Sequence, residues 1–217
     1  MIKYIGSKRV IVPQIASIVA ALPDVRRVCD LFAGTTRVGQ ALKSKGFYVV
    51  CNDLASYSEV LGRAYIQADA RTIDRNRLLA LLAHLQALPP QPGYVTHTFC
   101  EEARYFQPHN GAKIDAIRPE IDRIAESDEE RAILLTSLLL AADRVDSTTG
   151  LQMAYLKDWA ARSYQPLDLR LPELLPGTGR VFRRDANDLA RELDDVDLVY
   201  IDPPYNQHSY FSNYHIW

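Results

Sequence analysis

Hydrophobic positions near the start of the chain fall into two short apolar runs separated by one amphipathic stretch. Residues 25–32 predict a buried strand whose start Arg26 and Arg27 weaken, residues 47–51 predict a second strand, and residues 37–45 have the hydrophobic spacing of a helix. A small-residue turn at 33–36 precedes this helix, and Gly46 ends it. The order strand, glycine turn, helix, strand predicts a βαβ unit.

The middle of the chain has a helical pattern. Thr72 is the expected N-cap of one helix, and Pro119 is expected to interrupt another. Ser127 and Glu130 have the spacing of a capping box. The expected helices cover residues 58–67, 73–88, 113–126 and 128–145. A mostly helical segment therefore interrupts the α/β pattern.

Sheet character returns near the carboxyl end. Residues 180–182 predict a short strand that ends near Asp185, residues 186–193 a short helix, and residues 197–201 a further strand. We expect an α/β fold with a Rossmann-like sheet and a helical insertion. The expected division is 1–70 for the first half of the α/β domain, 71–165 for the insertion, and 166–217 for the return to the sheet.

The tetrad Asp202-Pro203-Pro204-Tyr205 directly follows the last apolar run. It places a carboxylate, a proline carbonyl and an aromatic ring at the carboxyl end of a strand, where open α/β sheets bind ligands. These groups suit methylation of the exocyclic amino group of a nucleobase. Asp202 and the Pro203 carbonyl can each accept a hydrogen bond from one N–H of this amino group, and Tyr205 can stack on the base. The same tetrad is also compatible with a simple turn.

The turn at Gly34 and the acid Asp53 indicate a nucleotide cofactor. Asp53 follows the second strand, where an acid reaches the ribose hydroxyls of an adenosine group. Thr36 occupies the second glycine position of a dinucleotide motif, and Gln40 excludes a P-loop. Asp185 can meet an adenine amino group or cap the next helix. The Gly34 turn and Asp53 alone are also compatible with a nicotinamide-dependent dehydrogenase. When the tetrad is considered as well, S-adenosylmethionine is the better-fitting cofactor.

Composition and charge narrow the class of protein. The net charge of −2 and pI of about 6.2 give no overall signature of nucleic-acid binding, so a DNA-binding face has to be local. The three cysteines have no metal-binding spacing, and Cys29 and Cys51 are expected to be buried thiols. We expect no signal peptide, and no apolar run of this sequence reaches membrane-spanning length. We expect a cytoplasmic protein.

Four motifs in this order resemble the DNA adenine methylase family with the alpha motif order. They are Tyr4-Ile5-Gly6-Ser7-Lys8, Asp30-Leu31-Phe32-Ala33-Gly34, Asn52-Asp53 and the Asp202–Tyr205 tetrad. The resemblance implies a Rossmann-like methyltransferase fold and transfer of a methyl group from S-adenosylmethionine to N6 of adenine in double-stranded DNA. It also implies a target-recognition region in the 71–165 insertion, and an associated restriction endonuclease as a possible partner.

The resemblance assigns roles to individual residues. Asp202, Pro203 and Tyr205 are the expected catalytic residues. The resemblance implies cofactor contacts for Tyr4, Lys8, Phe32, Gly34 and Asp53, and the positions of Asp185 and Asp202 near strand ends add these two acids to the expected contacts. Lys8 is expected near the methionine carboxylate of the cofactor.

Two departures from the family pattern are visible. Thr36 replaces a residue that is usually glycine, which predicts a less close approach to the cofactor. The chain ends at Trp217, whereas the sheet of the family continues after the tetrad, so we expect a chain truncated at its carboxyl end. An RNA-base methyltransferase, an N4-cytosine methyltransferase and an inactive remnant are the alternatives that the sequence leaves open.

Overall fold

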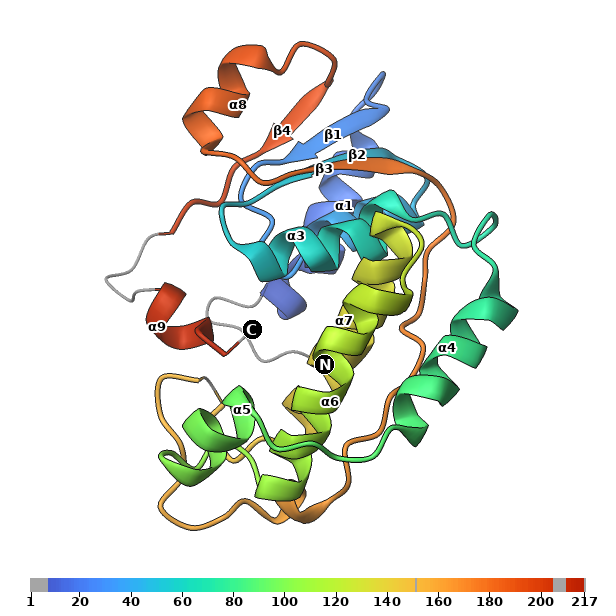
Figure 1. The fold of residues 1–217 in the computed structure, drawn as a ribbon. Helices are drawn as coiled ribbons and strands as arrows, with labels where there is room; N and C mark the ends of the chain where they lie inside the picture. Colours follow the sequence, from blue (N-terminus) through green and yellow to red (C-terminus); the bar gives the residue numbers. More distant parts are fainter. Residues whose placement is uncertain (1–7, 151, 205–209, 217) are drawn as a thin grey trace. The chain divides into compact units, whose positions relative to one another are not determined.

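The computed structural model describes residues 8–150, 152–204 and 210–216, and the chain in it divides into two compact units (Figure 1). Residues 8–73 and 173–204 form the sheet unit. Residues Asp74–Pro172 and 210–216 form the helical unit. Among the described residues, no helix is both long enough and apolar enough to cross a bilayer.

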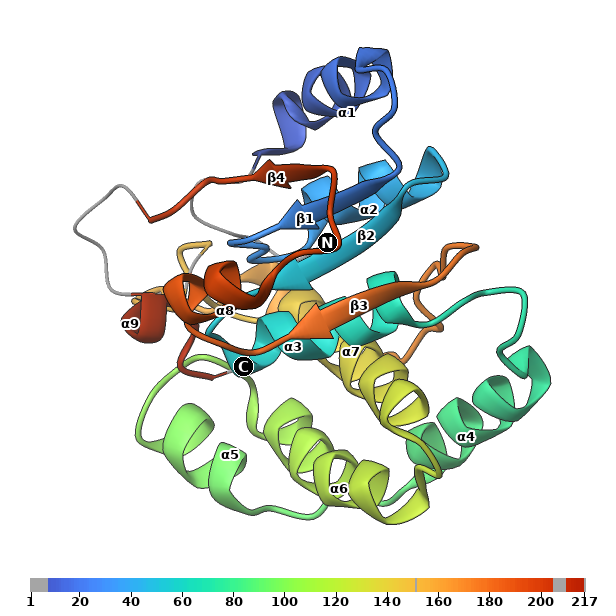
Figure 2. The ribbon, with the colours of Figure 1, turned by 90° about the horizontal axis from the view of Figure 1, so that it is seen from above.

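A four-stranded parallel sheet with the order β3-β2-β1-β4 organises the sheet unit (Figure 2). The central pair aligns Arg27 with Tyr48, and Asp30 of the first strand lies opposite Tyr200 of the last. The strands are β1 Arg27–Asp30, β2 Tyr48–Asn52, β3 Gly179–Phe182 and β4 Leu198–Tyr200. The expected βαβ unit and both late strands are confirmed.

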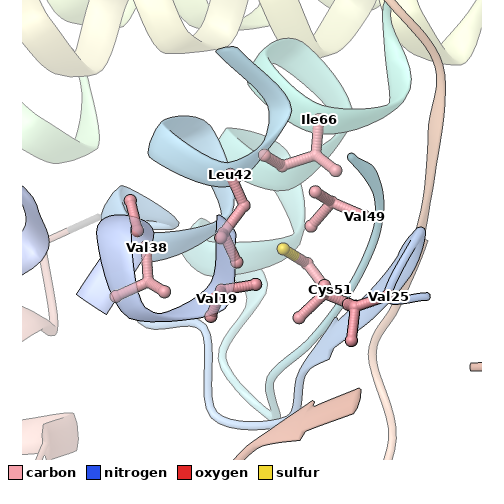
Figure 3. Close-up of a cluster of buried hydrophobic side chains, with 9 residues drawn as sticks. Val19, Val25, Val38, Leu42, Val49, Cys51 and Ile66 are labelled. Atoms are coloured by element: carbon pink, nitrogen blue, oxygen red, sulfur yellow. The ribbon is translucent and has the colours of Figure 1, made fainter. Parts of the chain in front are cut away.

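Helices cover both faces of this sheet, because alternate residues of its buried central strands point to opposite sides. Val28, Val49 and Cys51 pack with the helices on one face (Figure 3), whereas Cys29 and Val50 pack against α8 on the other. Figure 1 shows α8 on the opposite side of the sheet from α1 and α3. The helices are η1 Lys8–Val10, α1 Val12–Ala21, α2 Arg37–Ser44, α3 Ser56–Gly62, η2 Arg63–Gln67 and α8 Ala186–Glu192. Cys29 and Cys51 are buried free thiols, as expected.

Helix α2 packs very closely on strand β2 at Gly39. A Cβ atom at this position would lie 2.8 Å from Sγ of Cys51 and 3.2 Å from Cδ1 of Ile66. Gly39 therefore has the function of the third glycine in a nucleotide-binding turn, which is to let the helix approach the sheet.

A buried lysine completes the end of the π-helix η2. Lys43 is 2% exposed, and its Nζ donates hydrogen bonds of 3.0, 2.8 and 2.7 Å to the carbonyls of Tyr65, Ile66 and Ala68. These carbonyls lie at a helix end, where they lack partners within the helix. Burial lowers the pKa of Lys43 to about 8.

The helical unit contains the long antiparallel pair α6 and α7 with shorter elements around it. Asn110 of α6 is 1% exposed, donates to the carbonyls of Ser163 and Gln165 at 3.1 and 2.9 Å, and accepts from the Leu167 amide at 2.9 Å. This side chain holds an otherwise irregular segment against α6. The elements are α4 Arg75–Ala87, α5 Tyr94–Thr96, η3 His97–Glu101, α6 Pro108–Ile124, α7 Asp128–Val145, η4 Ala161–Tyr164 and α9 Tyr210–Tyr214.

Two local predictions in this unit are wrong and one is confirmed in part. Asp74, not Thr72, caps α4 by accepting from the Arg77 amide at 3.0 Å; the Thr72 hydroxyl instead donates to the Asp69 carbonyl. Pro119 lies inside α6 and does not interrupt it. The Ser127 half of the expected capping box is confirmed, because Ser127 accepts from the Glu130 amide at 3.1 Å, whereas Glu130 Oε1 accepts from the Glu126 amide at 2.9 Å.

Candidate functional site

Four carboxylates follow the carboxyl ends of the four parallel strands. Asp30 ends β1, Asp53 follows β2, Asp185 lies just after β3, and Asp202 lies just after β4. The chain continues from β1 to β2 on one side, and β4 pairs with β1 on the other, so β1 and β4 flank a topological switch point. Ligands of open α/β sheets bind in the crevice at such a point.

The turn after β1 contains two residues in the left-handed region. Gly34 has φ +50° and Thr36 has φ +59°. A β-branched residue in this region costs about 1–3 kcal/mol. Hydrogen bonds compensate in part, because the Thr36 hydroxyl donates to the Thr35 carbonyl at 2.7 Å and accepts from Gln40 Nε2 at 2.9 Å. Thr36 thus adopts a backbone conformation that glycine adopts without strain.

Asp53 supports this turn from the end of β2. Its Oδ2 accepts from the Gly34 amide at 2.8 Å, and its Oδ1 accepts from the Ala55 amide at 3.0 Å. Each carboxylate oxygen has a second lone pair. Asp53 can therefore hold the turn and still accept hydrogen bonds from a ligand.

Asn52, the last residue of β2, forms hydrogen bonds with the segments that follow β1 and β3. The sequence analysis did not identify this role. The side chain is 1% exposed. Its Nδ2 donates to the carbonyls of Leu31 and Arg184 at 3.2 and 3.1 Å, and its Oδ1 accepts from the Arg184 amide at 3.1 Å. The turn after β1 and the segment before Asp185 are therefore fixed to β2. The only hint of this role in the sequence was an amide side chain at the last position of a strand that was expected to be buried.

Asp30 is a buried acid that the sequence analysis assigned to a motif but not to a role. It is 2% exposed. Burial raises its pKa from 3.8 to about 7, the backbone N–H of Gly39 lowers it in part, and the charges of Asp53 and Asp202 raise it further. Asp30 thus accepts from the first turn of α2 and lies within electrostatic range of two other acids.

Asp202 forms an ion pair with Lys8. Lys8 Nζ lies 2.8 Å from Asp202 Oδ2, and the two side chains are 20% and 27% exposed. The structure therefore places Lys8 on the acid of the tetrad. Pro203 follows in an exposed position. Tyr4 and Tyr205, also predicted site residues, lie outside the described residues.

Phe32 and Asp185 lie on the side of the site nearest α8. Phe32 is partly buried and packs on the cluster of Cys29, Leu31, Val50 and Leu189. Asp185 caps α8 by accepting from the Asn187 amide at 2.8 Å, which lowers the pKa of Asp185. The capping role is confirmed, and a contact with adenine stays a prediction.

The site therefore combines a glycine turn, acids at the carboxyl ends of its strands, and the first residues of the tetrad in one unit. Asp53 and Asp202 lie close enough to Asp30 at the switch point for their charges to raise its pKa, and Lys8 offsets the charge of Asp202.

Comparison with known proteins identifies the family. Residues 4–217 match the D12 class N6 adenine-specific DNA methyltransferases. The type II methyltransferase M.NlaIII of Neisseria lactamica is 35% identical over 98% of this chain and 67% of its own length. The modification methylase StsI of Streptococcus sanguinis is 33% identical over 99% of this chain, and the type II methyltransferase M.CviAII of Paramecium bursaria Chlorella virus 1 is 31% identical over 99%.

The chain spans 35% of the length of the StsI methylase and 67% of M.CviAII. The matches nevertheless include both the sheet unit and the helical unit, because they extend over almost all of this chain. With its glycine turn, strand-end acids and Asp-Pro-Pro-Tyr tetrad, the chain belongs to the family of D12 class N6 adenine-specific DNA methyltransferases.

Proposed function

We propose that this protein transfers a methyl group from S-adenosylmethionine to N6 of adenine within a defined sequence of double-stranded DNA. The observation that carries the proposal is the position of the tetrad. Asp202 lies at the topological switch point, within electrostatic range of Asp30 and on the same sheet edge as Asp53 and the Gly34 turn. A nucleotide site and an amino-group acceptor therefore share one edge.

The residues at this edge fit S-adenosylmethionine. Asp53 retains lone pairs for the two ribose hydroxyls, and the turn at Gly34 has the backbone shape that lets a nucleotide approach. When bound, the cofactor supplies the electrophilic methyl group. We assign further cofactor contacts to Tyr4, Lys8, Phe32 and Asp185.

Adenine N6 is a weak nucleophile, because its lone pair is delocalised into the ring. The tetrad can make it more reactive. Asp202 and the Pro203 carbonyl each accept a hydrogen bond from one N–H of the amino group. This pair of hydrogen bonds favours a tetrahedral nitrogen whose lone pair is free to attack. Tyr205 stacks on the base once it has left the duplex, where stacking is worth about 1–3 kcal/mol. Two successive prolines fix φ and remove backbone donors that would compete for these acceptors.

Lys8 has a positioning role in this scheme. In the ion pair, Oδ2 of Asp202 faces the lysine and Oδ1 is left for another partner. Because both side chains are partly exposed, such a pair is worth only about 0–1 kcal/mol and can rearrange at low cost. Lys8 can therefore hold Asp202 and also interact with the methionine carboxylate of the cofactor.

The names of the relatives support a place in restriction and modification. We propose that the protein acts on DNA in the cytoplasm and protects its target from an associated restriction endonuclease. The experiment is digestion of plasmid DNA recovered from cells with and without the chain, using a panel of adenine-sensitive endonucleases. Resistance at one sequence supports the proposal, and its loss in Asp202→Ala assigns the resistance to this site. Unchanged digestion by every enzyme, despite N6-methyladenine in the DNA, would contradict a role in protection.

A further inference from the structure

A short hairpin of the helical unit, residues 147–156, contacts the segment that follows the tetrad. Thr148 and Tyr155 form an antiparallel bridge, and the Leu156 amide donates to the Ser147 carbonyl at 2.8 Å. The Gln152 amide, near the tip, donates to the Asn213 carbonyl at 3.1 Å. The hairpin is therefore bonded to the carboxyl-terminal part of α9.

The base of this hairpin is firmly held. Arg162 pairs with Asp146 at 2.6 Å and donates to the Thr148 carbonyl at 3.0 Å. Asp146 also accepts from the Thr148 hydroxyl at 2.8 Å, and the Ser147 hydroxyl accepts from the Ala160 amide at 3.0 Å. Several bonds therefore join residues 146–148 to residues 160–162. These bonds fix the base of the hairpin to η4 and to the residue before it.

Gln152 contacts the post-tetrad segment a second time through its side chain. Gln152 is 4% exposed, and its Oε1 accepts from the Ile216 amide at 3.1 Å. The main chain and side chain of one residue thus hold Asn213 and Ile216. This contact requires an acceptor at position 152, because an apolar side chain of equal length would leave the Ile216 amide without a hydrogen-bond partner there.

Aromatic contacts hold the residue between these two points. The ring of His215 lies 5.8 Å from that of Phe99 and 5.7 Å from that of Tyr105, and Tyr105 packs edge-on against Tyr155 of the hairpin at 5.2 Å. Ring pairs at these separations are attractive. The segment 213–216 is thus fixed to the hairpin and to η3 by polar and aromatic contacts together.

We propose that Gln152 is a positioning residue for methyl transfer, which anchors the carboxyl-terminal end of the segment that contains Tyr205. This inference rests on the proposed function. Asp202 is held at the other end of the segment by β4 and by Lys8. Gln152 acts through this anchor and not on the reacting atoms. Because a misplacement of about 1 Å can cost about 10²-fold in rate, loss of one anchor reduces turnover without a change in the cofactor site.

The test uses three variants of the full chain. Gln152→Met keeps length and burial but removes the acceptor, whereas Gln152→Glu keeps an oxygen acceptor for the Ile216 amide. Gln86→Met is the matched control. Gln86 also bonds at both ends of its amide within the helical unit, to the Leu167 carbonyl at 3.1 Å and the Leu169 amide at 2.8 Å, and both of these partners lie outside segment 213–216.

Methyl transfer at saturating DNA and cofactor is the first measurement. We expect Gln152→Met to lower kcat by about 10–100-fold with an unchanged Kd for S-adenosylmethionine, and Gln152→Glu to recover most of the loss. Gln86→Met should lower the Tm but leave kcat close to wild type. Wild-type kcat in Gln152→Met, or an equal loss in Gln86→Met, overturns the inference.

Hydrogen exchange of the peptide covering residues 210–216 separates this inference from the proposed function. Exchange should be faster in Gln152→Met than in the wild type and unchanged in Gln86→Met. Unchanged exchange in Gln152→Met overturns the anchor even where the enzyme is active. An inactive wild type with faster exchange in Gln152→Met contradicts the proposed function and with it the positioning role, while the anchor stands.

Discussion

Replacement of Asp30 by asparagine should make the protein more stable, and increasingly so as the pH rises. The side chain is 2% exposed, and its pKa is raised from 3.8 to about 7. Between these two values the unfolded chain has lost the proton and the folded chain keeps it, so stability falls as pH rises through this window. Above about pH 7 the folded state contains the buried charge, and the full cost is present.

The size of the effect follows from the pKa difference. Each unit corresponds to about 1.4 kcal/mol, so a shift from 3.8 to about 7 corresponds to about 4 kcal/mol for the whole window. Asparagine does not ionise and retains an oxygen that can accept from the Gly39 amide. The stability advantage of Asp30→Asn should therefore grow by about 3 kcal/mol between pH 5 and pH 8.

Urea unfolding of both proteins at pH 5, 6, 7 and 8 measures this growth. Because only the change with pH is used, any constant effect of the substitution cancels. Asp185→Asn is the matched control: Asp185 is exposed and its pKa lies below the usual range, so the effect of its replacement should not depend on pH. An advantage of Asp30→Asn that is the same at pH 5 and pH 8 would show that Asp30 does not have a raised pKa in the folded protein.

Three further substitutions have defined outcomes. Lys43→Met should lower the free energy of unfolding by at least about 3 kcal/mol in urea, because three buried carbonyls lose a charged donor; a loss below about 1 kcal/mol would contradict this. Asp53→Asn should weaken S-adenosylmethionine about 10–100-fold by calorimetric titration, since charged acceptors contribute about 1.5–3 kcal/mol; unchanged affinity would remove the ribose assignment. Asn110→Leu should cost about 3 kcal/mol in the same urea assay, because it breaks three buried bonds; a neutral effect would show that the bonds contribute nothing net.

The sheet and the tetrad could be predicted because their signals are local. Strand β2 is an apolar run, and the short β1 has buried Val28 and Cys29 at its centre; a glycine turn follows β1 and an acid follows β2. The capping residues Ser127 and Asp185 act on amides only two or three positions away. Signals of this range can be read from a single sequence.

Packing explains the errors in helix prediction. Helix α1 was not predicted; it has no side-chain cap and no acidic residue in its first turn. Pro119 costs about 3 kcal/mol in a helix interior, yet α6 continues through it. Ile117 and Ile121 on either side of the proline are fully buried, and their burial outweighs this cost.

Long-range partners explain what the site analysis missed. Asn52 bonds to Arg184, which lies 132 positions away, and Gln152 bonds to Ile216, which lies 64 positions away. The raised pKa of Asp30 depends on Asp202, which the sheet brings close only when the chain has folded. Nothing in the sequence around these residues specifies such partners. Both the positioning contacts and the electrostatics of the site therefore required the structure.

Transfer of a labelled methyl group from S-adenosylmethionine to unmethylated double-stranded DNA tests the central claim most directly. The DNA is digested to nucleosides, and the label is identified by chromatography. We expect label in N6-methyladenine, and its loss in Asp202→Ala. Label in a cytosine nucleoside, or no label from a chain that binds the cofactor and the DNA, would contradict it.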